Sequence, residues 1–241
     1  KMPNYYLPHK YDTTKKAAII ENGVLKLTIK PGMRGSSSDK KCKCRERAEL
    51  GFRTPINGTT YYSFKFRTDG VGKSNTRDEN GDHVRTMIAQ IKPKPNVGSP
   101  PMAVYLEKGG SVKCLEYEKK SADTKSKRIK ESQTANSSGV GSIKTSGIKN
   151  TYRVDKIKRL LGIDLKDGNW HKIEMTYKPS NTDGYCKIVI DGRTILEKSG
   201  IDNILAKKQL YIGPRIGIYR DSLSYSQTVY YDDLTIKFTP E

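Results

Sequence analysis

Hydrophobic residues recur at every second position in many short segments of the chain. In residues 61–67, Tyr62, Phe64 and Phe66 alternate with polar residues, and residues 171–177 show the same alternation. A two-residue period is typical of a β-strand with one buried face. The segments with strand character are residues 24–29, 61–67, 86–91, 102–106, 171–177, 186–190, 210–212, 215–219 and 229–238. The pattern therefore predicts an all-β fold.

Short turns that contain glycine separate these segments. Asn, Asp and Gly tolerate the positive φ angles that tight turns between antiparallel strands need. The turn pairs are Asn57-Gly58, Asn80-Gly81, Asp167-Gly168, Asp183-Gly184 and Asp191-Gly192. Helical periodicity is confined to residues 154–161, which predicts one or two helical turns. We expect a single domain over residues 1–241, because all-β sandwiches often reach about 200–250 residues as one domain.

One segment departs from the strand pattern. Residues 119–159 are rich in Lys and Arg, with many Ser, Thr and Gly residues and few acids. We interpret the segment as a long basic excursion over one face of the sheet. Because long loops in compact domains are often functional, it is either a lid or flank of a groove for a polyanion, or a solvated loop.

The charge of the chain points to an anionic partner. The net charge is +19, from 45 Lys and Arg against 26 Asp and Glu. A positive potential of this size attracts nucleic acid, anionic membranes and acidic polysaccharides. No apolar run approaches the roughly 18 residues of a membrane span, and no basic amphipathic helix is present, which argues against a membrane partner. Residues 1–5 contain no signal-like apolar segment, but a signal could have been removed, so secretion stays open.

The four cysteines are Cys42, Cys44, Cys114 and Cys186. They allow three pairings of two disulfides, although two cysteines that one residue separates rarely bond to each other. Zinc requires compact pairs of nitrogen or sulfur ligands, and the single C-x-C pair lies far from the histidines in the sequence. We therefore expect free or partly paired structural cysteines and no metal site.

Three expected strands carry polar side chains on one face and apolar side chains on the other. Alternate residues of a strand share a face. If the strands are neighbours, their polar faces form one cationic surface with a single phenol, made of Arg45, Arg47, Gln90, Lys92, Arg215 and Tyr219. An ordinary antiparallel sheet with one solvated face gives the same alternation. Gly217 favours a functional surface, because glycine inside a strand often marks close approach by a ligand or by another backbone.

Four motifs lie in these regions in a fixed order. They are residues 47–50 (RAEL), 88–92 (IAQIK), 169–192 (from NWHK to DG) and 215–220 (RIGIYR). Their order resembles the jelly-roll polysaccharide lyases, the alginate, glucuronan and heparin-lyase-like enzymes, whose patterns are roughly R-x-E-L, Q-I-H and K-x-G-x-Y. Two positions depart from these patterns, because Lys92 replaces the usual His and Arg215 the usual Lys. The resemblance implies a concanavalin-like β-jelly-roll sandwich of two antiparallel sheets with a concave substrate groove.

The resemblance also implies a chemistry. Such lyases cleave a uronic-acid polymer by β-elimination, which requires neutralisation of the carboxylate, removal of the carbon-5 proton and protonation of the oxygen that leaves carbon 4. Arg47 is the expected carboxylate clamp, and Gln90 the expected donor to the enolate-like oxygens. Tyr219 is the expected acid and base, because a nearby Arg215, Arg220 or Lys92 would favour its ionised form.

The number of proton-transfer groups depends on the sugar. In glucuronate and mannuronate the carbon-5 hydrogen and the leaving oxygen share a side, so Tyr219 could serve both steps. Guluronate and iduronate need two groups, and Lys92 is then the base with Tyr219 as acid; otherwise Lys92 is a second carboxylate clamp. His83 is a further candidate for the base, or an ordinary loop histidine. The expected substrate-binding residues are Arg45, Arg215, Arg220 and Tyr105, the last of which either stacks on a sugar or packs in the core.

We therefore expect a monomeric, endo-acting lyase for glucuronan or an alginate-like polymer, secreted or virus-associated and acting on a cell wall. It needs no cofactor, but Asp232-Asp233 could help to hold a structural calcium ion away from the groove. The alternative is a non-catalytic binding module for acidic polysaccharides on the same fold. Nucleic acid is not the expected partner, because Tyr152 is the one aromatic residue in the basic segment 119–159.

Overall fold

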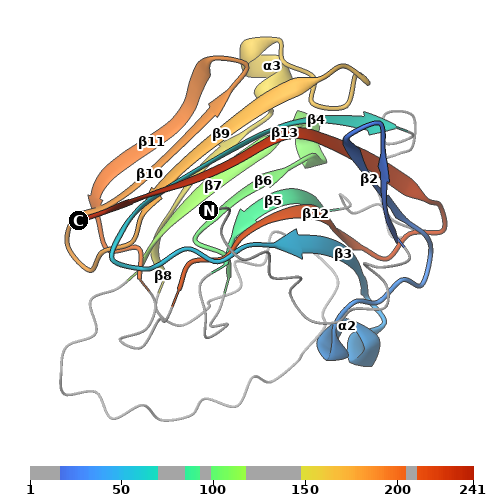
Figure 1. Ribbon diagram of the computed structural model, residues 1–241, viewed down its shortest axis with the longest axis horizontal. Coiled ribbons are helices and arrows are strands. Elements are labelled where there is room, and N and C mark those ends of the chain that lie inside the picture. The colour runs from blue at the N-terminus through green and yellow to red at the C-terminus, as the bar shows by residue number, and fades with distance from the viewer. Residues whose placement is uncertain (1–16, 70–84, 93–98, 118–147, 205–210) are drawn as a thin grey trace.

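The computed structural model describes residues 17–69, 85–92, 99–117, 148–204 and 211–241. In these residues, two antiparallel sheets pack face to face (Figure 1). A seven-stranded sheet has the order β1-β2-β13-β4-β9-β10-β11, and a six-stranded sheet has the order β3-β12-β5-β6-β7-β8. The predicted all-β jelly-roll sandwich is thus confirmed.

Long, twisted strands make up most of both layers. The strands of the seven-stranded sheet are β1 (Ala18–Glu21), β2 (Val24–Ile29), β13 (Gln227–Pro240), β4 (Gly58–Asp69), β9 (His171–Lys178), β10 (Gly184–Ile190) and β11 (Arg193–Ile201). The strands of the six-stranded sheet are β3 (Arg45–Gly51), β12 (Pro214–Asp221), β5 (Thr86–Ile91), β6 (Met102–Tyr105), β7 (Ser111–Tyr117) and β8 (Ile148–Asp155). The helical elements are α2 (Ser37–Cys42), α3 (Ile157–Leu161) and the 3-10 turn η1 (Glu107–Gly109).

The core lies between the two sheets and uses the alternation seen in the sequence. Phe64 of β4 and Tyr231 of β13 pack against each other, and Ile218 of β12 contributes from the facing sheet. A disulfide between Cys114 of β7 and Cys186 of β10 joins the two sheets across this core. The second disulfide joins Cys42 and Cys44, so the expectation that this close pair would stay unbonded is wrong.

The basic segment does not lie entirely outside the sheets. Residues 118–147 are outside the described residues, but residues 148–155 form β8, the edge strand of the six-stranded sheet. The expected helix begins at residue 157 rather than 154. Of the expected strand 210–212, Ile212 forms an isolated bridge with Thr54. The interpretation as a loop is therefore wrong for residues 148–155, whose backbone pairs antiparallel with β7.

Gly217 permits a close approach between two backbones. Its φ is 142°, and a Cβ atom there would lie 2.2 Å from the carbonyl oxygen of Ala48 on β3. The close approach expected at Gly217 is therefore to the backbone of another strand, and not to a ligand. Between Ile216 and Tyr219, β12 also has one residue more than its partner β5. A bulge of this kind re-aims the side chain that follows it, which here is Tyr219.

Candidate functional site

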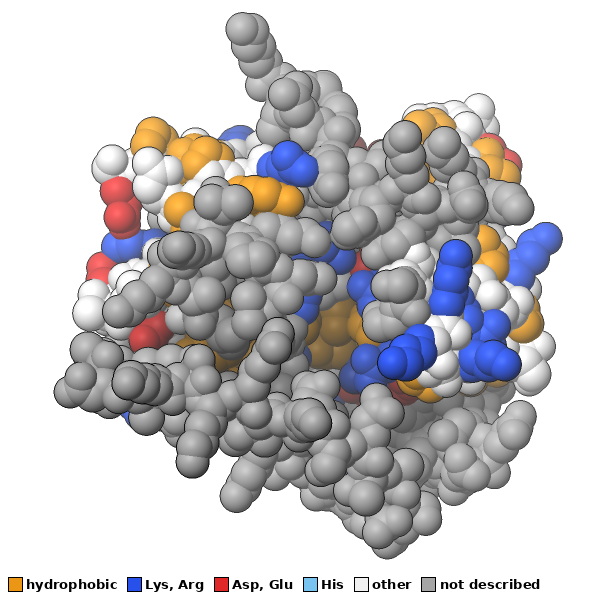
Figure 2. All heavy atoms as spheres, turned by 90° about the horizontal axis from the view of Figure 1, so that it is seen from below, with side chains coloured by type: hydrophobic (Ala, Val, Ile, Leu, Met, Phe, Trp, Pro, Cys, Tyr) orange, Lys and Arg blue, Asp and Glu red, His pale blue; other side chains and the backbone are white. Residues whose placement is uncertain are grey.

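The outer face of the six-stranded sheet brings together most of the predicted polar residues. The strands β3, β12 and β5 are neighbours in the sheet, as the polar pattern predicts. Tyr219 lies opposite Arg47 and Met87 in the register, and Arg215 lies opposite Gln90. Figure 2 views this side of the molecule and shows a hollow with hydrophobic side chains at its floor and Lys and Arg side chains around it.

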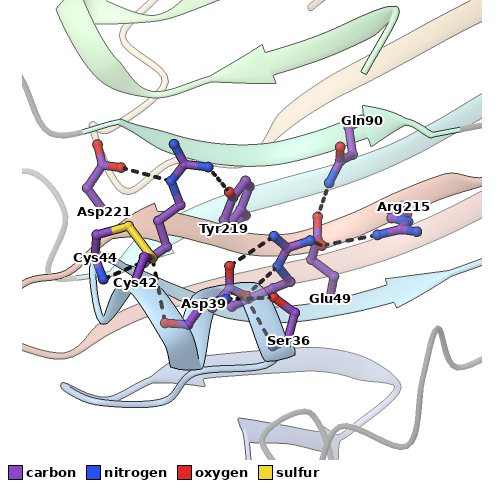
Figure 3. Close-up of polar contacts among 11 residues, drawn as sticks. Ser36, Asp39, Cys42, Cys44, Glu49, Gln90, Arg215, Tyr219 and Asp221 are labelled. Atoms are coloured by element: carbon purple, nitrogen blue, oxygen red, sulfur yellow. Dashed lines mark hydrogen bonds and ion pairs between the residues drawn. A yellow bond between two sulfur atoms is a disulfide. The ribbon is translucent and has the colours of Figure 1, made fainter. Parts of the chain in front are cut away.

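A buried carboxylate lies at the centre of this polar surface. Glu49 is 3% exposed and accepts a hydrogen bond from the amide nitrogen of Gln90. Its Oε2 also lies 3.4 Å from Nη1 of Arg47 and 3.5 Å from Nη1 of Arg215 (Figure 3). One carboxylate from β3 thus fixes side chains from three strands. Alternation along residues 45–49 places Glu49 on the face of Arg45 and Arg47 and indicates that it braces one of them, which the contact with Arg47 confirms; the contacts with Gln90 and Arg215 were not predicted.

Arg47 is bound by protein carboxylates on two sides. Its Nε lies 3.1 Å from Oδ2 of Asp39 and its Nη2 lies 3.3 Å from Oδ1, in addition to the contact with Glu49. The same guanidinium lies 3.9 Å from the ring centroid of Tyr219. The group that we expected to clamp a substrate carboxylate therefore already has two anionic partners, and it positions the phenol ring.

The short helix α2 supplies Asp39. The side chain of Ser36 accepts a hydrogen bond from the backbone of Asp39, and the carboxylate of Asp39 accepts one from the backbone of Ser36. This reciprocal capping box begins the helix, and Lys43 in the left-handed conformation ends it next to the Cys42–Cys44 disulfide (Figure 3). The sequence analysis missed Asp39, although the Ser-x-x-Asp spacing is a recognisable signal.

Three arginines surround Tyr219. Nη1 of Arg45 donates a hydrogen bond of 2.7 Å to the phenol oxygen, and the guanidiniums of Arg45 and Arg85 lie 5.7 Å and 5.6 Å from the ring centroid. Asp221 pairs with both of these arginines and so keeps them on this side of the sheet. Arg215 was predicted to lie near the phenol, but it precedes Tyr219 by four residues, which is about 13 Å along β12. The cations next to Tyr219 are thus Arg45, Arg47 and Arg85.

Arg220 does not reach this surface. It shares the opposite face of β12 with Ile216 and Ile218, is fully buried and forms an ion pair with Glu46, with Nη2 and Oε2 2.6 Å apart. The expectation that Arg220 binds substrate placed it on the wrong side of the sheet, because adjacent residues of a strand point in opposite directions. Arg220 anchors the core edge instead.

Lys92 follows β5 directly, and its backbone nitrogen donates to the carbonyl oxygen of Gly213. It lies two residues from Gln90, on the same side of the strand. His83 lies outside the described residues.

Tyr105 of β6 packs on the floor of this surface rather than in the main core. It forms a separate hydrophobic cluster with Met87, Ala103 and Tyr219. Burial, reinforced by the charge of Glu107, raises the pKa of Tyr105. The ring is 3% exposed and is therefore packed rather than open to a sugar, and its phenol remains protonated at neutral pH.

Lys113 of β7 was missed by the sequence analysis. Its Nζ lies 5.6 Å from the ring centroid of Tyr105. Burial lowers its pKa to about 8, and the charges of Arg153, Arg85 and Lys92 contribute. The signal was present in β7, where Ser111 and Lys113 alternate with apolar residues. This lysine can therefore lose its proton near neutral pH, which a solvated lysine does not.

The described residues give no group of three or more His, Cys, Asp or Glu side chains that could hold a metal ion. Asp232 and Asp233 lie on β13 in the other sheet, where Asp233 pairs with Lys65 at 2.7 Å. A calcium ion at this position would have to displace that lysine. The structural calcium ion remains a prediction. Within the same residues, no helix has the length and apolar character of a membrane span.

Comparisons with known proteins give a family and a shared fold. A family model described as polysaccharide lyase matches residues 4–235. An endo-β-1,4-glucuronan lyase from the fungus Trichoderma reesei has a similar structure, with 16% identity, a TM-score of 0.56 and coverage of 98% of this chain and 94% of the fungal chain. An alginate lyase from Klebsiella pneumoniae has 11% identity and a TM-score of 0.54, with 92% and 84% covered. At these identities the structures show a common fold. No curated protein matches the chain in sequence.

Proposed function

Because the chain belongs to the polysaccharide lyase family, we propose that it is an endo-acting lyase that cleaves glucuronan or an alginate-like uronic-acid polymer by β-elimination. The net charge of +19 suits an acidic polymer. The glucuronan and alginate lyases with the same fold supply the substrate class. The observation that carries the proposal is the phenol of Tyr219, which accepts a 2.7 Å hydrogen bond from Arg45 on the cationic face.

Tyr219 is the proton-transfer group in this proposal. In β-elimination the carbon-5 hydrogen leaves as a proton, its electron pair forms the double bond to carbon 4, and the bond from carbon 4 to the leaving oxygen breaks. As a phenolate, Tyr219 accepts the proton; as a phenol, it returns one to the leaving oxygen. The charge of Arg45 stabilises the phenolate during this exchange, and Arg47 keeps the ring in place.

In this proposal Gln90 and Lys92, at the end of β5, bind the substrate carboxylate. The contact with Glu49 fixes the amide of Gln90, so that its orientation exists before substrate binds. Lys92 supplies positive charge two residues further on. Arg215 and Arg47 are positioning residues, because both are bound to Glu49.

Lys113 provides a second base. It lies three strands from Tyr219 across the cluster of Tyr105, and its pKa of about 8 leaves a neutral amine available near neutral pH. Glucuronate and mannuronate need Tyr219 alone, whereas guluronate and iduronate need groups on opposite faces of the sugar. For those polymers the proposal takes Lys113, whose Nζ lies 5.6 Å from the ring centroid of Tyr105, as the base and Tyr219 as the acid.

The test is the ultraviolet absorbance of the protein mixed with glucuronan, polymannuronate, polyguluronate or heparin. β-Elimination leaves a conjugated unsaturated uronate that hydrolysis does not produce. We expect absorbance to rise with at least one polymer, and Tyr219→Phe to reduce the rate by about 100-fold or more while polymer binding persists. Tyr185→Phe on the other sheet is the matched control, because the hydroxyl of Tyr185 contacts Glu197 and neither residue belongs to the site. Salt-sensitive binding to all four polymers without any absorbance would refute catalysis and leave a polysaccharide-binding module.

The two disulfides support action outside the cell. Disulfides persist in oxidising compartments, and all four cysteines are paired here. We therefore propose that the enzyme is secreted or virus-associated and meets its polymer in a cell wall or matrix.

A further inference from the structure

A row of alternating cations and aromatic rings crosses the seven-stranded sheet. Tyr230 of β13 lies opposite Lys26 of β2 on one side and Arg67 of β4 on the other. Trp170 precedes β9 and extends the row, because the next residue, His171, pairs with Phe66. These side chains are partly or largely exposed, whereas their strand neighbours Leu27, Phe66 and Val229 are buried in the core, so the row lies on the outer face of the seven-stranded sheet.

The guanidinium of Arg67 lies between two rings. Its Cζ is 3.9 Å from the ring centroid of Tyr230 and 5.5 Å from that of Trp170. Lys26 ends the row on the other side of Tyr230, with its Nζ 5.9 Å from the ring centroid of Tyr230. Trp170 is 41% exposed, an unusual degree for a tryptophan in a folded protein. With neighbouring strands about 4.8 Å apart, the row is roughly 14 Å long, enough for several sugar units.

Arg67 differs from neighbouring cations of this face, whose charges are neutralised by carboxylates. On the same face, Lys65 pairs with Asp233, Lys172 with Glu174 and Lys187 with Glu197. Among the described residues, no carboxylate lies within ion-pair distance of Arg67. Asp69, the nearest acid along β4, accepts a hydrogen bond from the hydroxyl of Tyr230 instead. An arginine stacked on rings keeps its N–H groups in the plane available for an external carboxylate.

We propose that Trp170, Arg67, Tyr230 and Lys26 form a second, non-catalytic binding site for an acidic polysaccharide. The exposed indole of Trp170 stacks on the apolar face of a sugar ring, and Arg67 binds a uronate carboxylate with paired hydrogen bonds. Lys26, whose Nζ lies 3.9 Å from Oε2 of Glu21, ends the row on the other side of Tyr230. That the bound polymer is the enzyme's own substrate rests on the proposed function. The existence of the site rests on the geometry of this row alone.

The site explains why one face of a monomer would carry exposed aromatic and cationic groups far from the hollow. An endo-acting enzyme loses its polymer after each cut, and a second attachment point on the same molecule raises the local concentration of chain ends and segments. The advantage exists for long chains alone, because a short oligosaccharide cannot reach both faces.

The test measures binding without cleavage. In a Tyr219→Phe background, affinity electrophoresis and calorimetry with glucuronan and alginate compare Trp170→Ala, Arg67→Gln and the double variant with Lys65→Gln, a cation of the same face that already has a partner. We expect the double variant to bind long polymer about 5- to 10-fold more weakly, and a tetrasaccharide within about twofold of the parent. Trp170→Phe should retain most of the affinity, which separates loss of a stacking ring from loss of folding.

Two outcomes keep this proposal distinct from the proposed function. If the double variant and Lys65→Gln bind long polymer equally well, the second site is refuted, even where the parent enzyme is an active lyase. If the double variant loses affinity but the parent never produces an absorbance signal, the second site stands on its own and the catalytic proposal fails.

Discussion

The outer faces of the two sheets carry the same kinds of charged side chain in opposite arrangements. On the six-stranded sheet, Glu49 is 3% exposed and contacts three side chains from three strands. On the seven-stranded sheet, Lys65 and Asp233 pair with each other, and their side chains are 46% and 60% exposed. Water can solvate the second pair without help, whereas the first carboxylate depends on its protein donors.

This difference separates a preorganised site from a solvated surface. A buried charge persists where several partners compensate its lost hydration, and those partners are then fixed in one geometry. Proton transfer and charge stabilisation need such fixed geometry, so we expect catalysis on the outer face of the six-stranded sheet, where Glu49 lies. Exposed pairs tolerate movement, which is sufficient for holding a polymer.

The largest expected effect comes from removing the central carboxylate. Glu49→Gln leaves Arg47 and Arg215 without their shared anion, and breaking a buried ion pair costs about 3–5 kcal/mol. We expect the free energy of unfolding, measured with urea, to fall by about this amount, and lyase activity to fall with it because Gln90 loses its fixed orientation.

Asp233→Asn on the other sheet is the matched control. It removes one carboxylate from an exposed pair, and Asn tolerates the positive φ of 51° at this position. The expected change in unfolding free energy is within about 0.5 kcal/mol. Equal losses in the two variants would contradict the distinction between the faces.

The next effect concerns Lys113 and the pH dependence of catalysis. Its pKa is lowered to about 8 by burial and by neighbouring cations. As a base it acts in its neutral form, so kcat/KM on polyguluronate should rise as pH increases through about 8. Lys113→Arg cannot deprotonate; we expect it to abolish that rise and to lower activity by roughly 100-fold.

Lys65→Arg controls for the change of cation at an exposed position. A fall in wild-type kcat/KM above the pKa of Lys113 would contradict its role as base. It would assign the lysine instead to the substrate carboxylate, as an ammonium ion.

The sequence predicts the fold and the set of polar residues that share the outer face of the six-stranded sheet. Strict alternation reveals which face of a strand is polar, so it places Arg45, Arg47, Gln90 and Tyr219 together, as the register of β3, β12 and β5 does. The same reasoning failed for Arg220 because it was chosen for its nearness to Tyr219 in sequence, and adjacent strand residues point to opposite faces.

The remaining site residues come from contacts that periodicity does not encode. Asp39 reaches Arg47 from a short helix that precedes β3, and the order of strands in the sheet brings Lys113 near Tyr105. The lowered pKa of Lys113 arises from burial and from charges on other elements. Both effects depend on tertiary packing, which single-sequence patterns report only indirectly.

The smallest expected effect lies at the start of β9 in the seven-stranded sheet, where His171 contacts two acids. Nδ1 lies 2.7 Å from Asp191 and Nε2 lies 3.1 Å from Asp167. Burial lowers the pKa of His171, but the hydrogen bonds and charges of Asp191 and Asp167 outweigh burial and raise it overall. A raised pKa in the folded state stabilises the protein fully below the unfolded value of about 6.5, and this stabilisation is lost as pH rises through the folded value.

We therefore expect urea unfolding to show a higher stability at about pH 5.5 than at about pH 8.5 from this group, with His171→Gln removing that component. The difference should be of order 1 kcal/mol or less, because the carboxylates of Asp167 and Asp191 are 33% and 36% exposed and water screens them. Glu49→Gln should leave the same pH dependence intact, since the two clusters lie in different sheets. If His171→Gln instead destabilised the protein equally at both pH values, the histidine would act through neutral hydrogen bonds and packing against Phe66, and the start of β9 would carry no titrating charge.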